Sequence, residues 1–157
     1  MTPTNKPQGC QGCFFAESGH GFVPDLAARQ TPQFDIIGDR PWKSELTSGQ
    51  PFAGSAGFVL KQWGIAAVPA IKLAWDSGKV TLMNTLRCLP ASLEESQRFQ
   101  RSHAHAQAAK HCRQYDAVAA PTRILCGEVP QRAWFPVELA AEDAVDRAAG
   151  RELKGVM

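Results

Sequence analysis

The stretch FDIIGDRPW, residues 34–42, holds the strand that decides the fold. Its apolar run ends at a Gly-Asp turn, which is typical of a buried strand that delivers a carboxylate at its carboxyl end. A second apolar run, in TLMNTLRCLP (residues 81–90), ends with an asparagine, an arginine and a cysteine. Between them, GQPFAGSAGFVL (residues 49–60) leads from a loop of small residues into a helix, where backbone N–H groups can face an anion. Ligands of open α/β sheets bind beyond the carboxyl ends of the strands, so we expect these segments to line one cleft.

The rest of the sequence alternates between strand and helix patterns. We expect strands at Phe34–Ile37, Lys79–Leu86 and Thr122–Cys126, and a strand or helix at Val68–Trp75. We expect helices at Asp25–Arg29, Ser55–Trp63, Pro90–Cys112 and Val137–Ala149, and a polar loop at Lys43–Gln50. The helix at 55–63 has an apolar stripe of Phe58, Val59 and Trp63 and a cap at Gly64, and a capping box at Ser92–Glu95 opens the helical stretch at 90–112. This alternation predicts a single α/β domain over residues 1–157 with a mainly parallel sheet, after a flexible segment at 1–9.

Composition sets broad limits on function. With 157 residues, 44% of them hydrophobic, the chain is long enough to bury one core. The net charge of +2 does not by itself indicate a nucleic-acid partner. Basic residues gather between 98 and 123, which fits phosphate contacts and a solvated helix surface equally well. The sequence has no run of eighteen apolar residues and no signal-peptide pattern, so we expect a cytoplasmic protein that does not enter a membrane.

Five cysteines in a reducing compartment favour metal binding or chemistry over disulfides. Cys10 and Cys13 form a C-x-x-C pair, whereas Cys88 and Cys112 fall at loops or element ends; Cys126 lies in an apolar run and is expected in the core. The first four match the number of ligands of a cubane iron–sulfur cluster or a tetrahedral zinc ion. Spacing alone leaves two alternatives open: Cys88 and Cys112 are incidental, or the C-x-x-C is a redox pair.

Taken together, the motifs resemble those of the iron–sulfur uracil-DNA glycosylases, families 4 and 5 of that superfamily. The similar segments, between about Cys10 and Gly127, are the C-x-x-C pair, GDRPW, PFAGSAG, MNTLRCLP and Cys112. Thirteen positions separate Asp39 from Phe52 and four separate Asn84 from Cys88, as in the family. The resemblance implies a three-layer α/β/α sandwich and hydrolysis of the N-glycosidic bond of uracil flipped from DNA.

The resemblance also implies roles for individual residues. Phe52 would stack on the flipped base and Asn84 would hydrogen-bond to its edge. Asp39 would position or activate water, and Glu45 matches a second acidic position of some members. Gly54, Ala56 and Gly57 would let the backbone approach a DNA phosphate. A [4Fe–4S] cluster, or alternatively zinc, would be held by Cys10, Cys13, Cys88 and Cys112.

The sequence departs from the family pattern in three places. GDRPW carries an aspartate where the family has glutamate, and Arg40 and Trp42 replace small residues. The long interval between Cys88 and Cys112 predicts an insertion, Gln100–Ala109, that is looped out. No histidine follows His111, so the C-terminal histidine motif of the family has no counterpart and that part of the fold is expected to be absent.

The resulting expectation is a uracil-DNA-glycosylase-like iron–sulfur protein that binds DNA, a replication protein, or both. The resemblance extends to domains joined to phage DNA polymerases, which suggests a polymerase or other replisome subunit that covers an open sheet edge. One alternative is an active uracil-DNA glycosylase completed by a partner chain. The other is an interaction module stapled by zinc.

Overall fold

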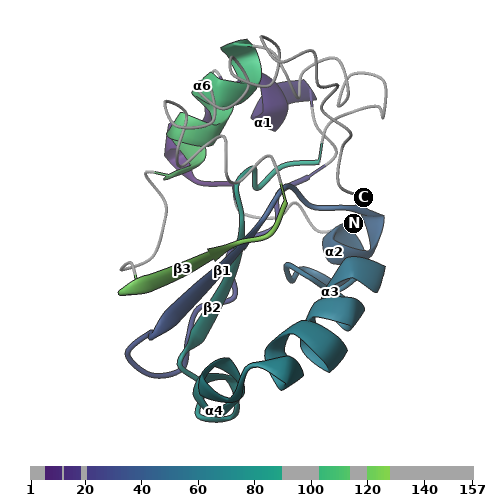
Figure 1. Ribbon diagram of the computed structural model, residues 1–157. Helices are drawn as coiled ribbons and strands as arrows, with labels where there is room; N and C mark the ends of the chain where they lie inside the picture. The colour runs from purple at the N-terminus through teal and green to yellow at the C-terminus, as the bar shows by residue number, and fades with distance from the viewer. Residues whose placement is uncertain (1–5, 12, 19–20, 90–102, 114–119, 128–157) are drawn as a thin grey trace, which may run out of the picture.

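A parallel three-stranded sheet forms the centre of the computed structural model, which describes residues 6–11, 13–18, 21–89, 103–113 and 120–127 (Figure 1). The strands β1 (Phe34–Gly38), β2 (Val80–Asn84) and β3 (Thr122–Leu125) lie in the order β2-β1-β3. Both pairs are parallel, and Gly38 is the register partner of Asn84. The carboxyl ends of β1 and β2 therefore lie next to each other at the same end of the sheet. The described part of the chain is a mixed α/β domain.

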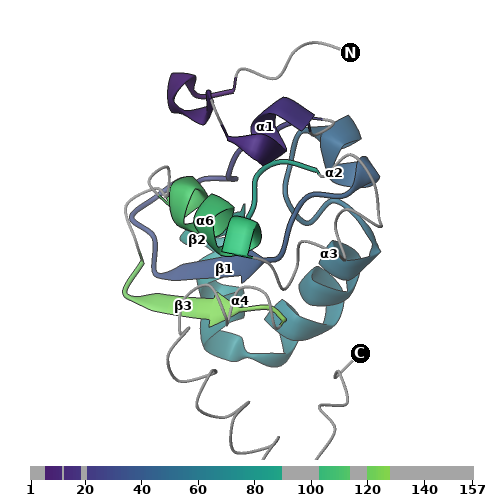
Figure 2. The same cartoon turned by 90° about the horizontal axis from the view of Figure 1, so that it is seen from above.

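Short helices surround this sheet. In chain order they are η1 (Gln8–Cys10), α1 (Phe14–Ser18), α2 (Lys43–Ser48), α3 (Ser55–Val59), the π-helix η2 (Leu60–Ile65), α4 (Pro69–Asp76) and α6 (His103–Cys112). The helices α1 and α6 lie close together in both views, whereas α3, η2 and α4 follow one another away from them (Figures 1 and 2). Within the described residues, no helix has the length and apolar character needed to cross a lipid bilayer.

Two buried clusters hold these elements together. One contains Ile36 and Leu82 from the sheet with Ile65 and Ala74 from η2 and α4. The other lies beyond the carboxyl end of β2 and joins Phe15 of α1 to Ala108 and Ala109 of α6, among other residues. Burial of apolar surface is the main favourable term in folding, so these clusters fix the helices against the sheet.

The three predicted strands are confirmed, and each of their ends lies within two residues of the predicted one. The segment 68–75, for which strand and helix were both open, corresponds to helix α4. The expected polar loop at 43–50 is wrong, because residues 43–48 form α2. The backbone N–H of Trp42 donates to Oε2 of Glu45 at 2.7 Å, which satisfies a donor at the start of this helix. Gly49, at φ 71°, ends it in the left-handed conformation.

Other predictions are corrected in the same way. Gly64 lies inside η2 instead of capping the helix. No helix forms at 25–29, because the backbone of Leu26 pairs with that of Leu82 on the outer side of β2. The predicted apolar stripe of the helix is not buried: Phe58 is 63% exposed and Trp63 72%.

The remaining predictions fall partly on residues that are not described. Of the stretch 90–112, the structure describes α6, whose buried Ala108 and Ala109 contradict a looped-out insertion there. The capping box at 92–95 and the helix at 137–149 lie outside the described residues, as do residues 1–5 of the segment expected to be flexible. Residues 8 and 9 of that segment belong to η1, so a fully flexible segment 1–9 is not what the structure shows.

Candidate functional site

The register of the sheet brings Phe52 and Asn84 together at Gly38. A Cβ atom on Gly38 would lie 2.6 Å from Oδ1 of Asn84 and 2.8 Å from Cζ of Phe52. Only a residue without a side chain fits between them, since real Cβ atoms do not approach other atoms that closely. The two residues that the resemblance assigned to base binding therefore converge on the carboxyl end of β1.

Phe52 is held in an unusual backbone conformation. Its φ of 56° is in the left-handed region, which is uncommon for a bulky residue. Its N–H donates to Oε1 of Glu45 at 2.6 Å, and its carbonyl accepts from Nζ of Lys61 at 3.1 Å. A Cβ on Gly57 would lie 1.8 Å from the Phe52 carbonyl oxygen, so α3 packs directly on this backbone. Such strain persists where the surrounding contacts hold it, and it often marks functional sites.

The small residues predicted to face a DNA phosphate have separate environments. Gly57 is buried against Phe52, and a Cβ on Gly54 would lie 2.7 Å from Oγ of Ser44. Close packing within the chain therefore accounts for both glycines. Ala56 is exposed. Of the three, Ala56 is the one that the structure places on the surface.

Asp39 directly follows β1 and is tied to the end of β2. Its carbonyl accepts from the N–H of Leu86 at 2.9 Å, while the carbonyl of Gly38 accepts from both N–H and Oγ1 of Thr85. The Asp39 carboxylate lies 3.3 Å from Nη1 of Arg40, and its side chain is 31% exposed. The Asp39 side chain is therefore partly open to solvent, although its Oδ1 is buried.

Glu45 is buried next to Phe52 and Asn84 and accepts a hydrogen bond from each of them. It is 7% exposed. Beside the bonds from Trp42 and Phe52, its Oε1 accepts from Nδ2 of Asn84 at 3.2 Å. Three donors from three different segments thus meet on one carboxylate.

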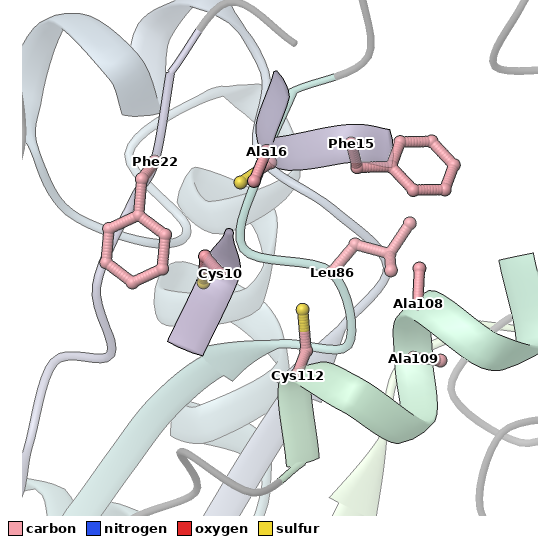
Figure 3. Close-up of a cluster of buried hydrophobic side chains, with 9 residues drawn as sticks. Cys10, Phe15, Ala16, Phe22, Leu86, Ala108, Ala109 and Cys112 are labelled. Atoms are coloured by element: carbon pink, nitrogen blue, oxygen red, sulfur yellow. The ribbon is translucent and has the colours of Figure 1, made fainter. Parts of the chain in front are cut away.

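The four predicted ligand cysteines gather in one place. Cys10, Cys88 and Cys112 belong to the buried cluster of Phe15, Phe22 and Leu86, with Cys13 packed against it at its margin. Figure 3 shows Cys10 and Cys112 on opposite elements, η1 and the end of α6, within this cluster. All four are free thiols. The N-terminal segment, the segment after β2 and the end of α6 supply this set of donors.

The environment of these thiols favours the protonated form. Burial, followed by the proximity of Cys112, raises the pKa of Cys88 to about 12, with smaller contributions from Cys10 and Cys13. Burial also raises the pKa of Cys112, against the opposing effect of Arg87. Thiolates crowded in this way repel one another, so ionisation of several of these groups together would need a cation between them. As they stand, no three His, Cys, Asp or Glu side chains of the described residues are arranged to hold a metal ion.

Arg87, which the sequence predicted in one of the segments that line the cleft, instead joins the cysteine cluster to the sheet. Arg87 is 2% exposed and forms two hydrogen bonds to the carboxylate of Asp25, at 2.9 and 2.7 Å. Its Nη1 donates to the carbonyl of Cys112 at 2.7 Å. The available signal was a single arginine between Leu86 and Cys88, directly after the predicted strand. Arginine is rarely buried without a partner.

Asp35 is a second buried charge that the sequence analysis missed. It is the second residue of β1, is 1% exposed, and accepts from the N–H of Ala120 at 2.9 Å. Nε of Arg123 lies 3.6 Å from the same oxygen. Asp35 therefore anchors the start of β3. Cys126, expected in the core, is half-buried against the cluster of Ile36 and Leu82, and burial raises its thiol pKa.

Comparisons of the chain with protein-family models and with curated proteins gave no match.

Proposed function

We propose that this chain is a uracil-DNA-glycosylase-like domain that binds DNA and takes an extrahelical pyrimidine base between Phe52 and Asn84. The observation that carries the proposal is the convergence at Gly38, where the Asn84 amide oxygen and the Phe52 ring approach the same point. These residues lie far apart in the sequence, and the family resemblance assigns to both a contact with the flipped base. Their convergence is what that assignment requires.

The chemistry of the two groups suits this ligand. A base must leave the duplex stack before a protein can read its pairing edge. An amide offers one donor and one acceptor to that edge, and an aromatic ring stacks on the face at a gain of about 1–3 kcal/mol per base. Phe52 is half-buried and Asn84 is 5% exposed, so both groups are held in place by the protein before a base arrives.

The scaffold in this proposal is the three-layer α/β/α sandwich of the family. The parallel order β2-β1-β3 and the helices that flank it support this arrangement. The partner in replication, a polymerase or another replisome subunit, would pair with the outer edge of β3, because residues around Leu26 cover the outer edge of β2. Bound DNA would lie across the carboxyl ends of β1 and β2.

The cysteine cluster is the proposed cofactor site. Cys10, Cys13, Cys88 and Cys112 would hold a [4Fe–4S] cluster, and zinc is the alternative. Cys10, Cys88 and Cys112 lie in one buried cluster with Cys13 packed against it, and four thiols are the number of ligands that either centre takes. When bound, such a centre would act as a staple that joins the N-terminal segment, the end of β2 and α6.

Hydrolysis of the glycosidic bond is the second candidate function. The position of Asp39 favours it, because this residue, with its partly exposed carboxylate, directly follows Gly38, on which Phe52 and Asn84 converge. A carboxylate there can orient a water molecule or stabilise the positive charge that develops on the sugar. The activity would make this chain a uracil-DNA glycosylase whose site is completed by a partner chain.

Binding of labelled duplexes by fluorescence anisotropy tests the first candidate. The two probes differ at one pair only: U·G in one and C·G in the other. We expect tighter binding of the U·G duplex, and we expect Asn84→Ala to remove the preference, a loss of about tenfold for one buried hydrogen-bonding group. Asp76→Ala, on the exposed surface of α4, is the control. Equal affinity of the wild-type protein for both duplexes would contradict the proposal.

Release of free uracil from the same U·G duplex tests the second candidate. Activity that is lost in both Asn84→Ala and Asp39→Asn would establish hydrolysis at this site. Absence of released uracil, with the chain alone and with its co-purified partner, would leave base binding as the function.

A further inference from the structure

We infer that Glu45 is a positioning residue that sets the Phe52 ring and the Asn84 amide as one unit, and that it does not act on reacting atoms. The inference rests on the proposed function, because it concerns the two groups assigned to the base. Glu45 is close to both and is itself buried at 7% exposure. A carboxylate that takes a proton from water needs access to water, which this burial denies.

The hydrogen bonds of Glu45 leave little room for another role. Its Oε1 accepts from the Phe52 N–H at 2.6 Å and from Asn84 Nδ2 at 3.2 Å, and its Oε2 accepts from the Trp42 N–H at 2.7 Å. Two of these donors share one oxygen. A shift of that oxygen therefore alters the hydrogen bonds of Phe52 and Asn84 at the same time.

For Phe52, the bond to Glu45 offsets backbone strain. A left-handed φ in a residue with a bulky side chain costs on the order of 1–3 kcal/mol and needs surrounding contacts to persist. The charge-assisted bond from the Phe52 N–H, at 2.6 Å, is one such contact. Without it, the loop loses one of the contacts that aim the ring at Gly38.

For Asn84, the bond to Glu45 decides which way the amide faces. A carboxylate can only accept, so the NH₂ group of Asn84 must face Glu45 and the oxygen must face away. The oxygen lies where a Cβ on Gly38 would be 2.6 Å away, on the side of the Phe52 ring. Glu45 thereby fixes Oδ1 as the acceptor that the site presents. Loss of Glu45 would allow the amide to flip and present a donor instead.

A double-mutant cycle on binding of the U·G duplex separates positioning from general destabilisation. We expect Glu45→Ala to weaken binding by about a hundredfold, since it disturbs both the stacking on Phe52 and the hydrogen bond of Asn84, each worth about tenfold. In the Asn84→Ala background, the further loss due to Glu45→Ala should be much smaller, because one of the two groups that Glu45 sets is already gone. An undiminished further loss would overturn the inference. Asp76→Ala serves as the matched carboxylate control.

A second, conservative variant, Glu45→Gln, keeps the inference testable if Glu45→Ala does not fold. Glu45→Gln retains an acceptor oxygen for the Phe52 N–H and the Asn84 amide and loses only the acceptor for Trp42. We expect it to fold and to bind the U·G duplex within about tenfold of the wild-type protein, the cost of one hydrogen bond. Glu45→Gln that folds and binds as weakly as Glu45→Ala would overturn the inference, because a retained acceptor would then have no value.

Side-chain amide signals in ¹H–¹⁵N spectra test the positioning without DNA. The Asn84 pair is assigned by its disappearance in Asn84→Asp. Glu45→Ala should shift this pair and bring its two protons closer in frequency, while Asp76→Ala leaves it in place. Unchanged Asn84 signals in Glu45→Ala would overturn the inference even if the DNA-binding proposal holds. Shifted signals in a protein that shows no preference for the U·G duplex would support the positioning and contradict the proposed function.

Discussion

Arg87 and Asp25 form a bidentate ion pair, with Nε 2.9 Å from Oδ1 and Nη2 2.7 Å from Oδ2. The two side chains are 2% and 10% exposed, so both charges are largely removed from water. The same guanidinium donates from Nη1 to the carbonyl of Cys112, the last residue of α6. One arginine thus joins the segment after β2, the segment before β1 and the end of α6. Its neighbour in the sequence is Cys88.

Removal of one partner of this pair should be costly. We expect Asp25→Ala to lower the free energy of unfolding by about 3–5 kcal/mol, because the Arg87 charge stays buried after its carboxylate is lost. Urea denaturation followed by circular dichroism measures the change. The matched control is Asp76→Ala, which removes an exposed pair with Lys72 and should cost about 1 kcal/mol or less. Equal effects of the two variants would show that Arg87 does not depend on Asp25.

Gly38→Ala should damage the proposed base site. The new methyl group would meet Oδ1 of Asn84 and Cζ of Phe52 at less than 3 Å, so one or both side chains must move. We expect a stability loss of about 1–3 kcal/mol from overpacking and loss of the preference for the U·G duplex. Gly64→Ala is the control, since its methyl would meet only Cδ1 of Leu60, at 3.2 Å. Unchanged base preference in Gly38→Ala would contradict the placement of the site.

Gly57→Ala should destabilise the protein more than Gly38→Ala. The methyl group at Gly57 would lie 1.8 Å from the carbonyl oxygen and 2.3 Å from the carbonyl carbon of Phe52. Backbone atoms cannot rotate away as side-chain ends can, so α3 must separate from the Phe52 loop. We expect a loss of about 3 kcal/mol in free energy of unfolding, measured by urea denaturation. A smaller loss than for Gly38→Ala would refute this ordering.

Cys126 should react slowly with iodoacetamide in the folded protein. Burial raises its pKa, and the thiolate is the reactive form, so the folded protein holds less of it at pH 8 than an unfolded chain does. Alkylation, followed by mass spectrometry of the peptide that contains Cys126, should accelerate as the pH rises and should become faster in denaturant. The same rate with and without denaturant at pH 8 would contradict the burial of this thiol.

The sequence predicted the parts of the fold that depend on local pattern. Apolar runs bounded by glycine turns located β1 and β2, whereas the register that pairs Gly38 with Asn84 is known only from the structure. The helix α2 was missed because its start depends on the side chain of Glu45 and not on a Ser, Thr, Asp or Asn cap. The convergence of Phe52 and Asn84 followed from the shared sheet edge together with the family resemblance.

The contacts that hold the site together could not be predicted from local sequence patterns. Arg87 and Asp25 are 62 positions apart, and nothing in either local sequence indicates the other. The two hydrogen bonds that share Oε1 of Glu45 require a positive φ at Phe52, a backbone conformation that is uncommon for a bulky residue. Tertiary packing selects such contacts, so they become visible only when the segments are placed in space.

The iron, sulfide and zinc content of anaerobically purified protein tests most directly whether this is an iron–sulfur, glycosylase-like domain. The comparison includes Cys112→Ser, which removes a proposed ligand, and Cys126→Ser, which removes the cysteine outside the cluster. We expect about four irons and four sulfides per chain in the wild-type protein and in Cys126→Ser, with a large loss in Cys112→Ser. One zinc per chain would support the zinc-stapled alternative. A wild-type protein without iron or zinc, or a Cys112→Ser variant as rich in iron as the wild type, would contradict the account.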